Sequence, residues 1–302
     1  MLTGITTGGL FDILGVEGSF SMLKEAGFDA VDFSFDVFCR LWSVHNGARD
    51  DLFFKDEEEL VEYFRPYKQA ADKYGLMIHQ AHAPFPSYFV NDDYTNAYAL
   101  EAIKKSFPII SMMGCRYLVV HPGFANYENR LEPEEEKKVN MALYSALIPC
   151  CKKYSITVCL ENMFTGNRGK IYEAICQNPD EANEYIDSLN ALAGQKCFAF
   201  CYDAGHALLL GRDQYKTLKQ LGHRVEILHV HDNNAVEDEH ISPFMGKLDW
   251  GRFVKGLKAI GYNGVMNLEA TNLYNRYPKE LLFSIYRQAA DTARYLAECV
   301  EA

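Results

Sequence analysis

The sequence predicts a single-domain (β/α)8 barrel, an α/β fold, and three observations lead to this fold class. Apolar strand-like runs alternate with segments in which apolar residues recur every three or four positions. Eight strands of this kind can be assigned, each followed by a helical segment, as in a (β/α)8 barrel. No G-x-G-x-x-G follows the first strand, which disfavours an open sheet that binds a dinucleotide. We therefore expect residues 1–302 to form one TIM-barrel domain.

The expected strands, in order, are residues 2–7, 30–35, 76–82, 117–121, 157–161, 197–203, 225–231 and 264–269. Between them, Pro133 and the three glutamates that follow it predict the start of a helix, because proline suits the first helical position and acids complement the helix dipole. Asp249 is a candidate cap of another helix, and the last helix is expected at about 278–300. Pro66, Pro108 and Pro149 interrupt helical patterns, and each is expected to kink or restart its helix.

Composition narrows the functional classes. The hydrophobic content of 48% and charged content of 24% are ordinary for a globular protein with a large core. The net charge of −11, from 30 basic and 41 acidic residues, disfavours a nucleic-acid partner. Apolar runs stay well below the roughly 20 residues of a membrane span, so no membrane partner is expected. Nine cysteines without C-x-x-C or a secretory signal predict reduced thiols in the cytoplasm, and a homo-oligomer stays an open possibility.

Ionisable side chains gather where a barrel carries its active site, at the carboxyl ends of the strands. The first two strands end in Thr6-Thr7 and Ser34, without strong ligands. His229 and His231 share one face of the seventh strand, because side chains alternate along a strand. The ionisable residues at or after the last six strands are His82, His121, Glu161, Asp203, His206, His229, His231, Asp232, Asp238, His240 and Glu269.

This set of residues predicts a metal site. Imidazole and carboxylate groups suit zinc, manganese, cobalt or magnesium. Taken singly, a histidine after an apolar strand is more often structural, but buried ionisable groups on six consecutive strands are costly unless they are paired or bind metal. His45, His79 and His223 lie outside this pattern and are interpreted as structural.

The motifs resemble the xylose-isomerase-like barrel superfamily, often called sugar phosphate isomerases/epimerases, which also contains endonuclease IV. The resemblance extends over essentially the whole chain. The matching motifs are His121-Pro122-Gly123, Leu160-Glu161-Asn162, Asp203-x-x-His206, His229-x-x-Asp232, Asp238-x-His240 with Gly246-Lys247-Leu248-Asp249-Trp250, and Glu269.

Resemblance to the ketose 3-epimerases implies one divalent ion (Mn, Zn, Co or Mg) and two acid/base glutamates. The implied metal ligands are Glu161, Asp203, His229 and Glu269, of which Glu161 and Glu269 are also the catalytic residues. His206 is implied to hold substrate. The chain departs from these epimerases at Ala235, where they carry arginine, and at Asn167, where they carry an acid.

Resemblance to endonuclease IV implies a different site with up to three zinc ions. Its nine ligands correspond to His82, His121, Glu161, Asp203, His206, His229, Asp238, His240 and Glu269. A multinuclear zinc phosphodiesterase, that is, an AP endonuclease, is therefore the alternative function. The residues His82, His121, His206, His231, Asp238 and His240 are accordingly assigned to substrate binding or to additional metal.

Together these observations predict a metal-dependent sugar isomerase or epimerase that acts on a small sugar or sugar-phosphate-like carbonyl compound. The reaction expected is proton abstraction next to the carbonyl. A barrel that only binds a sugar as a sensor is a third, less favoured hypothesis, because the chain has a complete set of ligands and both acid/base glutamates. If the substrate bears a phosphate, the candidate anchors are Arg168, Lys170, Arg212 and Lys247.

Overall fold

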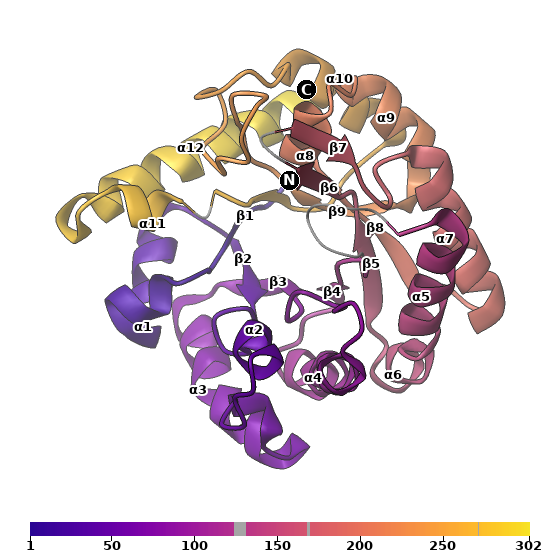
Figure 1. Ribbon diagram of the computed structural model, residues 1–302. Coiled ribbons are helices and arrows are strands. Elements are labelled where there is room, and N and C mark those ends of the chain that lie inside the picture. Colours follow the sequence, from indigo (N-terminus) through magenta and orange to yellow (C-terminus); the bar gives the residue numbers. More distant parts are fainter. Residues whose placement is uncertain (124–130, 168–169, 271) are drawn as a thin grey trace. The chain divides into compact units, whose positions relative to one another are not determined.

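The computed structural model describes residues 1–123, 131–167, 170–270 and 272–302, and within them strands alternate with helices along the chain (Figure 1). All eight expected strands are present, with bounds that differ from the expected ones by two residues or fewer at each end. They are β1 (Thr3–Thr6), β2 (Ala30–Ser34), β3 (Met77–His82), β4 (Tyr117–Val119), β5 (Thr157–Glu161), β8 (Phe198–Asp203), β9 (Val225–His229) and β10 (Met266–Leu268).

The helices follow the pattern expected from apolar periodicity, with short helical turns in some loops. They are α1 (Leu10–Ala26), α2 (Leu41–His45), α3 (Glu57–Tyr74), α4 (Asp93–Met112), α5 (Pro133–Ser145), α6 (Ile148–Tyr154), α7 (Pro179–Ala193), α8 (Ala204–Leu209), α9 (Gln214–Leu221), α10 (Trp250–Ile260), α11 (Leu273–Arg276) and α12 (Leu282–Glu301). Within the described ranges, none of them combines the length and the apolar character that crossing a bilayer requires.

Local sequence signals explain several helix ends. Pro133 occupies the first turn of α5, and the Asp249 carboxylate accepts a hydrogen bond of 3.0 Å from the Arg252 amide at the start of α10, as expected. A new helix, α6, begins around Pro149, whereas α3 and α4 continue through Pro66 and Pro108 without restarting.

The chain forms two compact units, and unit 1 consists of residues 1–33, 66–80 and 201–302. In it β1 pairs in parallel with both β2 and β10, with Gly4 opposite Ala30 and Asn267. A parallel bridge between Val230 and Leu268 joins the end of β9 to β10. Helices α1 and α12 pack against each other in this unit (Figure 1).

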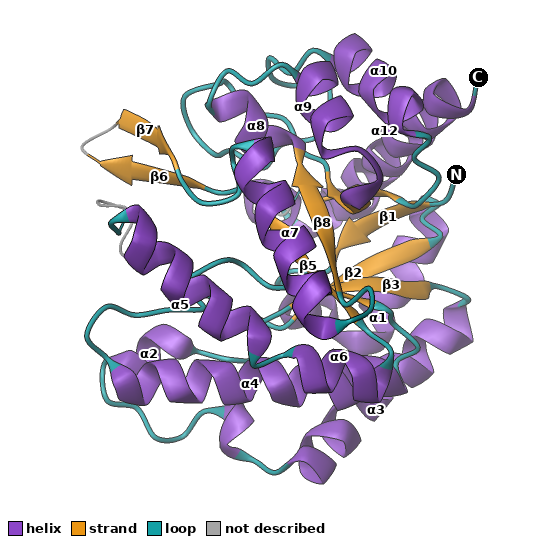
Figure 2. Cartoon of the chain, turned by 90° about the vertical axis from the view of Figure 1, so that its right-hand side faces the viewer, coloured by secondary structure: helices purple, strands orange, loops and turns teal. Residues whose placement is uncertain are grey.

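Unit 2 consists of residues 34–65 and 81–200. Here β4 pairs in parallel with β5, and the Val158 amide donates to the Cys197 carbonyl at 2.9 Å, which places the start of β8 beside β5. The unit also contains an antiparallel hairpin of β6 (Phe164–Asn167) and β7 (Lys170–Glu173), separate from the larger sheet (Figure 2). The sequence did not predict this hairpin, because its strands are four residues long and lack a continuous apolar run.

The large sheet has the strand order β10-β1-β2-β3-β4-β5-β8-β9. Strands β3 and β8 each contribute residues to both units. The side chains of β1, β2 and β8 are buried on both faces, as in a parallel sheet covered by helices. The predicted (β/α)8 fold is confirmed, while the assignment of residues 1–302 to one domain stays a prediction.

Candidate functional site

The ionisable residues singled out in the sequence lie at strand ends or just beyond them. Strands β3, β5, β8 and β9 end at His82, Glu161, Asp203 and His229, and Glu269 follows β10 directly. The remaining candidates follow a strand in the chain: His121 two residues after β4, His206 in α8, and His231, Asp232, Asp238 and His240 in the segment after β9.

Three of the expected metal ligands converge in unit 1. The ligand atoms of Asp203, His229 and Glu269 lie within 4.8 Å of one another. Both Asp203 and His229 are fully buried, and His229 Nδ1 lies 3.5 Å from Glu269 Oε2. The Asp203 carboxylate also caps α8, because its Oδ1 accepts a hydrogen bond of 2.6 Å from the His206 amide. Secondary structure therefore fixes the direction in which this carboxylate points.

A second cluster lies in the same unit and is richer in histidine. Ligand atoms of His206, His231, Asp238 and His240 lie within 4.8 Å of one another. Asp238 Oδ2 lies 2.8 Å from His240 Nε2 and 3.5 Å from His206 Nε2. The His231 and His240 rings stack, with centroids 4.0 Å apart and an angle of 8° between their planes.

The charges in this cluster stabilise one another. Burial disfavours ionisation of Asp238, but His206 and His240 outweigh it and hold the pKa of that carboxyl well below its usual range. Burial likewise disfavours a charged His240, yet Glu269, Asp238 and Asp203 raise the pKa of its imidazole to about 9. His240 Nδ1 donates to the Glu269 carbonyl at 2.9 Å and Nε2 to Asp238, as a protonated ring does. The neighbouring carboxylates therefore favour the protonated form of His240.

The His231 ring packs directly against Gly205, which has no Cβ atom. A Cβ atom added to Gly205 would overlap His231 Cε1 at a separation that side chains do not tolerate. The ring directs Nε2 to Asp203, 3.1 Å from Oδ1 and 3.2 Å from Oδ2. His231 thereby contacts one of the expected metal ligands while stacking on His240.

Unit 2 contains a third cluster, formed by His82, His121 and Glu161, whose ligand atoms also lie within 4.8 Å of one another. His121 Nε2 lies 2.8 Å from His82 Nε2 and 2.9 Å from Glu161 Oε2. His82 Nδ1 donates to the Ala83 carbonyl at 2.9 Å, so in a neutral ring Nε2 carries the lone pair that faces the cluster. The Phe85 ring packs edge-on against His121, with centroids 4.5 Å apart.

One buried carboxylate was not predicted from the sequence. Asp32, in the middle of β2, is fully buried and lies 2.9 Å from His229 Nε2. Ligands were expected at strand ends, whereas Asp32 stands two residues before the end of β2. An aspartate inside an otherwise apolar strand was the available signal, because a buried carboxylate needs partners.

The candidate phosphate anchors are less informative. Arg168 lies outside the described residues. Lys170 begins β7 in unit 2, while Arg212 and Lys247 lie in loops of unit 1 after α8 and β9. A role in phosphate binding stays a prediction for these residues.

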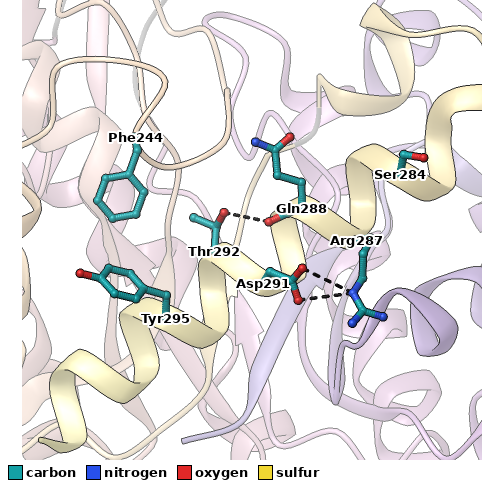
Figure 3. Close-up of a pocket in the computed structure, with 7 residues that line it drawn as sticks. All are labelled: Phe244, Ser284, Arg287, Gln288, Asp291, Thr292 and Tyr295. Carbon is teal, nitrogen blue, oxygen red and sulfur yellow. Dashed lines mark hydrogen bonds and ion pairs between the residues drawn. The ribbon is translucent and has the colours of Figure 1, made fainter.

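A groove beside α12 has a different character from the histidine clusters. Figure 3 shows the Asp291 carboxylate facing Arg287, at 3.3 Å, and the Thr292 hydroxyl donating to the Gln288 carbonyl at 2.8 Å. Phe244 and Tyr295 form its apolar side. Asp291 is the single carboxylate among the seven lining residues, and it is paired, so this groove lacks converging acid, base or metal ligands.

Comparison with known proteins assigns the chain to a family. The sequence profile described as the xylose isomerase-like TIM barrel matches residues 20–298. The chain belongs to this family. The resemblance inferred from the motifs is thus confirmed at the level of the family.

Solved xylose isomerase-like barrels share the fold. A D-tagatose 3-epimerase-like protein is 20% identical, with a TM-score of 0.71 and coverage of 100% of this chain and 98% of that one. D-allulose 3-epimerase from Methylomonas sp. is 17% identical, with a TM-score of 0.72 and coverage of 98% of both chains. At these identities the likeness establishes the fold of the family member, not its substrate.

A curated relative carries the other family activity in its name. Probable endonuclease 4 of Acholeplasma laidlawii is 26% identical over 212 residues, which are 65% of this chain and 68% of that protein. Both activities suggested by the motifs are therefore represented among proteins similar to this xylose isomerase-like barrel.

Proposed function

We propose that the chain is a divalent-metal-dependent isomerase or epimerase of a small sugar or sugar-phosphate-like carbonyl compound. The convergence of Asp203, His229 and Glu269 at the carboxyl ends of consecutive barrel strands carries this proposal. Enzymes with this fold perform their chemistry at that end of the strands. The similarity to a D-tagatose 3-epimerase-like protein and to D-allulose 3-epimerase supports the same reaction class.

The donor atoms fit a divalent ion. His229 Nδ1 and Glu269 Oε2 are 3.5 Å apart, which is long for a hydrogen bond. Two atoms each about 2.1 Å from one ion at a tetrahedral angle would be about 3.4 Å apart. We propose that Glu161, at the end of β5, completes the set. Strand β5 neighbours β8, which ends in Asp203, and this order supports the assignment.

A divalent ion held by these groups would supply a Lewis acid that polarises the substrate carbonyl. One of the two glutamates, Glu161 or Glu269, would remove the proton from the adjacent carbon, and the other would return it. Counted through the bridge that joins the end of β9 to β10, β5 and β10 stand three positions apart, so the two carboxylates would approach the substrate from different directions. His206 would hold a substrate hydroxyl beside them.

The decisive experiment follows a proton from solvent. Ketoses and their phosphates are incubated with the metal-loaded protein in deuterated water and examined by NMR. We expect deuterium on the carbon next to the carbonyl. Glu161→Gln and Glu269→Gln should each lower turnover by about 10²- to 10⁴-fold, the usual contribution of an acid or base, while retaining most of the metal.

The control variant is His223→Ala, which changes a histidine outside these clusters and should retain turnover. Isomerisation without solvent deuterium would indicate hydride transfer instead. Activity that falls only in proportion to lost metal would reduce both glutamates to ligands. No turnover on any carbonyl sugar, with metal bound, would contradict the proposal.

A zinc phosphodiesterase is the second candidate, and the two further clusters favour it. His82, His121 and Glu161 in unit 2, and His206, Asp238 and His240 in unit 1, are the remaining residues of the endonuclease IV pattern. Elemental analysis of protein purified without chelator separates the two functions. About one divalent ion per chain supports the isomerase, and nearly three zinc ions per chain would favour the phosphodiesterase.

A further inference from the structure

Asp32 is the buried centre of a hydrogen-bond network in unit 1. Its Oδ2 lies 2.9 Å from both His229 Nε2 and Gln80 Nε2. Longer contacts reach it from Asn267 Nδ2 at 3.4 Å and Thr6 Oγ1 at 3.5 Å. These donors come from β1, β3, β9 and β10, so four strands direct polar groups at one carboxylate of β2. A fully buried carboxylate is costly without such donors.

The orientation of Gln80 shows that its amide serves Asp32. The Gln80 Nε2 group also lies 3.3 Å from the Leu228 carbonyl, next to His229 in the chain. A carbonyl and a carboxylate are both acceptors, so the amide nitrogen of Gln80, rather than its oxygen, must face them. The surrounding side chains therefore supply donors to Asp32, as an ionised carboxylate requires.

The contact between Asp32 and His229 selects one form of the imidazole ring. An ionised carboxylate only accepts hydrogen bonds, so His229 must carry its proton on Nε2. In the neutral ring the lone pair then lies on Nδ1, the atom 3.5 Å from Glu269 Oε2. This is the atom that the proposed metal site requires to be unprotonated.

We propose that Asp32 is a positioning residue that fixes the Nε2–H tautomer and the ring orientation of His229 for metal binding. The inference rests on the proposed function only in that His229 is taken as a metal ligand. A carboxylate that accepts a hydrogen bond from one ring nitrogen of a ligating histidine fixes the orientation of the ring. It also makes the other ring nitrogen more basic, so that this nitrogen binds the ion more strongly. Asp32 contacts neither the ion nor the substrate in this arrangement.

The first test observes the wild-type protein and uses a variant only to assign one signal. In the metal-free wild-type protein at pH about 8, ¹⁵N NMR distinguishes the protonated from the unprotonated ring nitrogen of each histidine. We expect His229, assigned by comparison with His229→Gln, to be protonated on Nε2 alone. A ring protonated on Nδ1, or an even mixture of tautomers, would overturn the proposal.

The second test measures metal affinity by calorimetric titration with Mn²⁺, an ion suited to a site containing carboxylates. Asp32→Asn keeps the shape of the side chain but removes its charge. We expect it to raise the Mn²⁺ dissociation constant roughly 10- to 100-fold, the usual effect of removing the partner of a ligating group. An unchanged constant would overturn the proposal.

A matched control lies on the segment after β9. Asp232 is also fully buried in unit 1, but its carboxylate accepts from the amides of Asn233 and Leu248 and from the Trp250 indole. Although Asp232 belongs to the ionisable set that follows the strands, none of these three donors is a proposed metal ligand. Asp232→Asn should therefore perturb folding stability while changing the Mn²⁺ constant much less than Asp32→Asn. Equal loss of affinity in the two variants would reduce Asp32 to a general structural role. None of these readouts involves turnover, so failure to find a sugar substrate would contradict the proposed function alone.

Discussion

Some residues in unit 1 pack so closely that one added methyl group should lower the stability of the protein. Gly205 lies in α8, and its missing Cβ leaves the space that the His231 ring fills. Alanine has a better intrinsic helix propensity than glycine by roughly 0.5–1 kcal/mol. At this position the overlap with the His231 ring must outweigh that gain.

Gly205→Ala should destabilise the protein by about 1–3 kcal/mol, the usual cost of overpacking a buried site, measured by urea unfolding. Gly251→Ala in α10 is the control, because its added Cβ comes no closer than 3.4 Å to another atom. That variant should be neutral or slightly stabilising. The double variant Gly205→Ala/His231→Ala should recover stability relative to Gly205→Ala. Without such recovery, the His231 contact is not the cause.

At the scale of elements, the start of α4 is a capped helix end whose stability depends on pH. Asp92 precedes the helix and accepts hydrogen bonds from the Thr95 amide at 2.9 Å and from its hydroxyl at 2.5 Å. His45 Nδ1 lies 2.6 Å from the same carboxylate. The Thr95 hydrogen bonds, followed by His45, lower the pKa of Asp92 to about 2.

A carboxyl group whose pKa is lowered by folding adds stability above its unfolded pKa of about 3.9. This contribution is lost as the pH falls through the folded pKa of about 2. Asp92→Ala should cost about 1 kcal/mol at neutral pH, as for other helix caps. The difference between wild type and Asp92→Ala in the free energy of unfolding should shrink between pH about 4 and about 2. A difference independent of pH would mean that the charge of Asp92 does not matter.

The strands were predictable from the sequence, whereas contacts between distant residues were not. The eight strands were predictable because strands buried on both faces are apolar runs, as in β8, and their polar ends mark the site. The role of Asp32 was not predictable, because it depends on hydrogen-bond donors from four other strands. Only the assembled sheet of unit 1 brings these donors together. The close contact between Gly205 and the His231 ring could not be predicted for the same reason, because His231 lies 26 residues further along the chain.

At the scale of the whole molecule, charge separates the two candidate functions. Both would use the same kinds of ligand, so ligand identity does not distinguish them. Their substrates differ greatly in charge, because duplex DNA carries one negative charge per about 1.7 Å of its axis. A net charge of −11 repels such a polyanion and has much less effect on a small sugar.

Binding to a fluorescent duplex that contains an abasic site should therefore be weak. Even proteins with basic surfaces bind DNA nonspecifically with dissociation constants of only about 10⁻⁴ to 10⁻⁶ M at physiological salt. For this chain, anisotropy titration at about 0.15 M salt, where the Debye length is about 8 Å, should give a constant weaker than about 10⁻⁴ M. Zinc-loaded protein should behave similarly, because three divalent ions would add six positive charges to a net charge of −11. Submicromolar binding together with strand cleavage would show that a local surface overcomes the net charge, and the phosphodiesterase would then replace the isomerase.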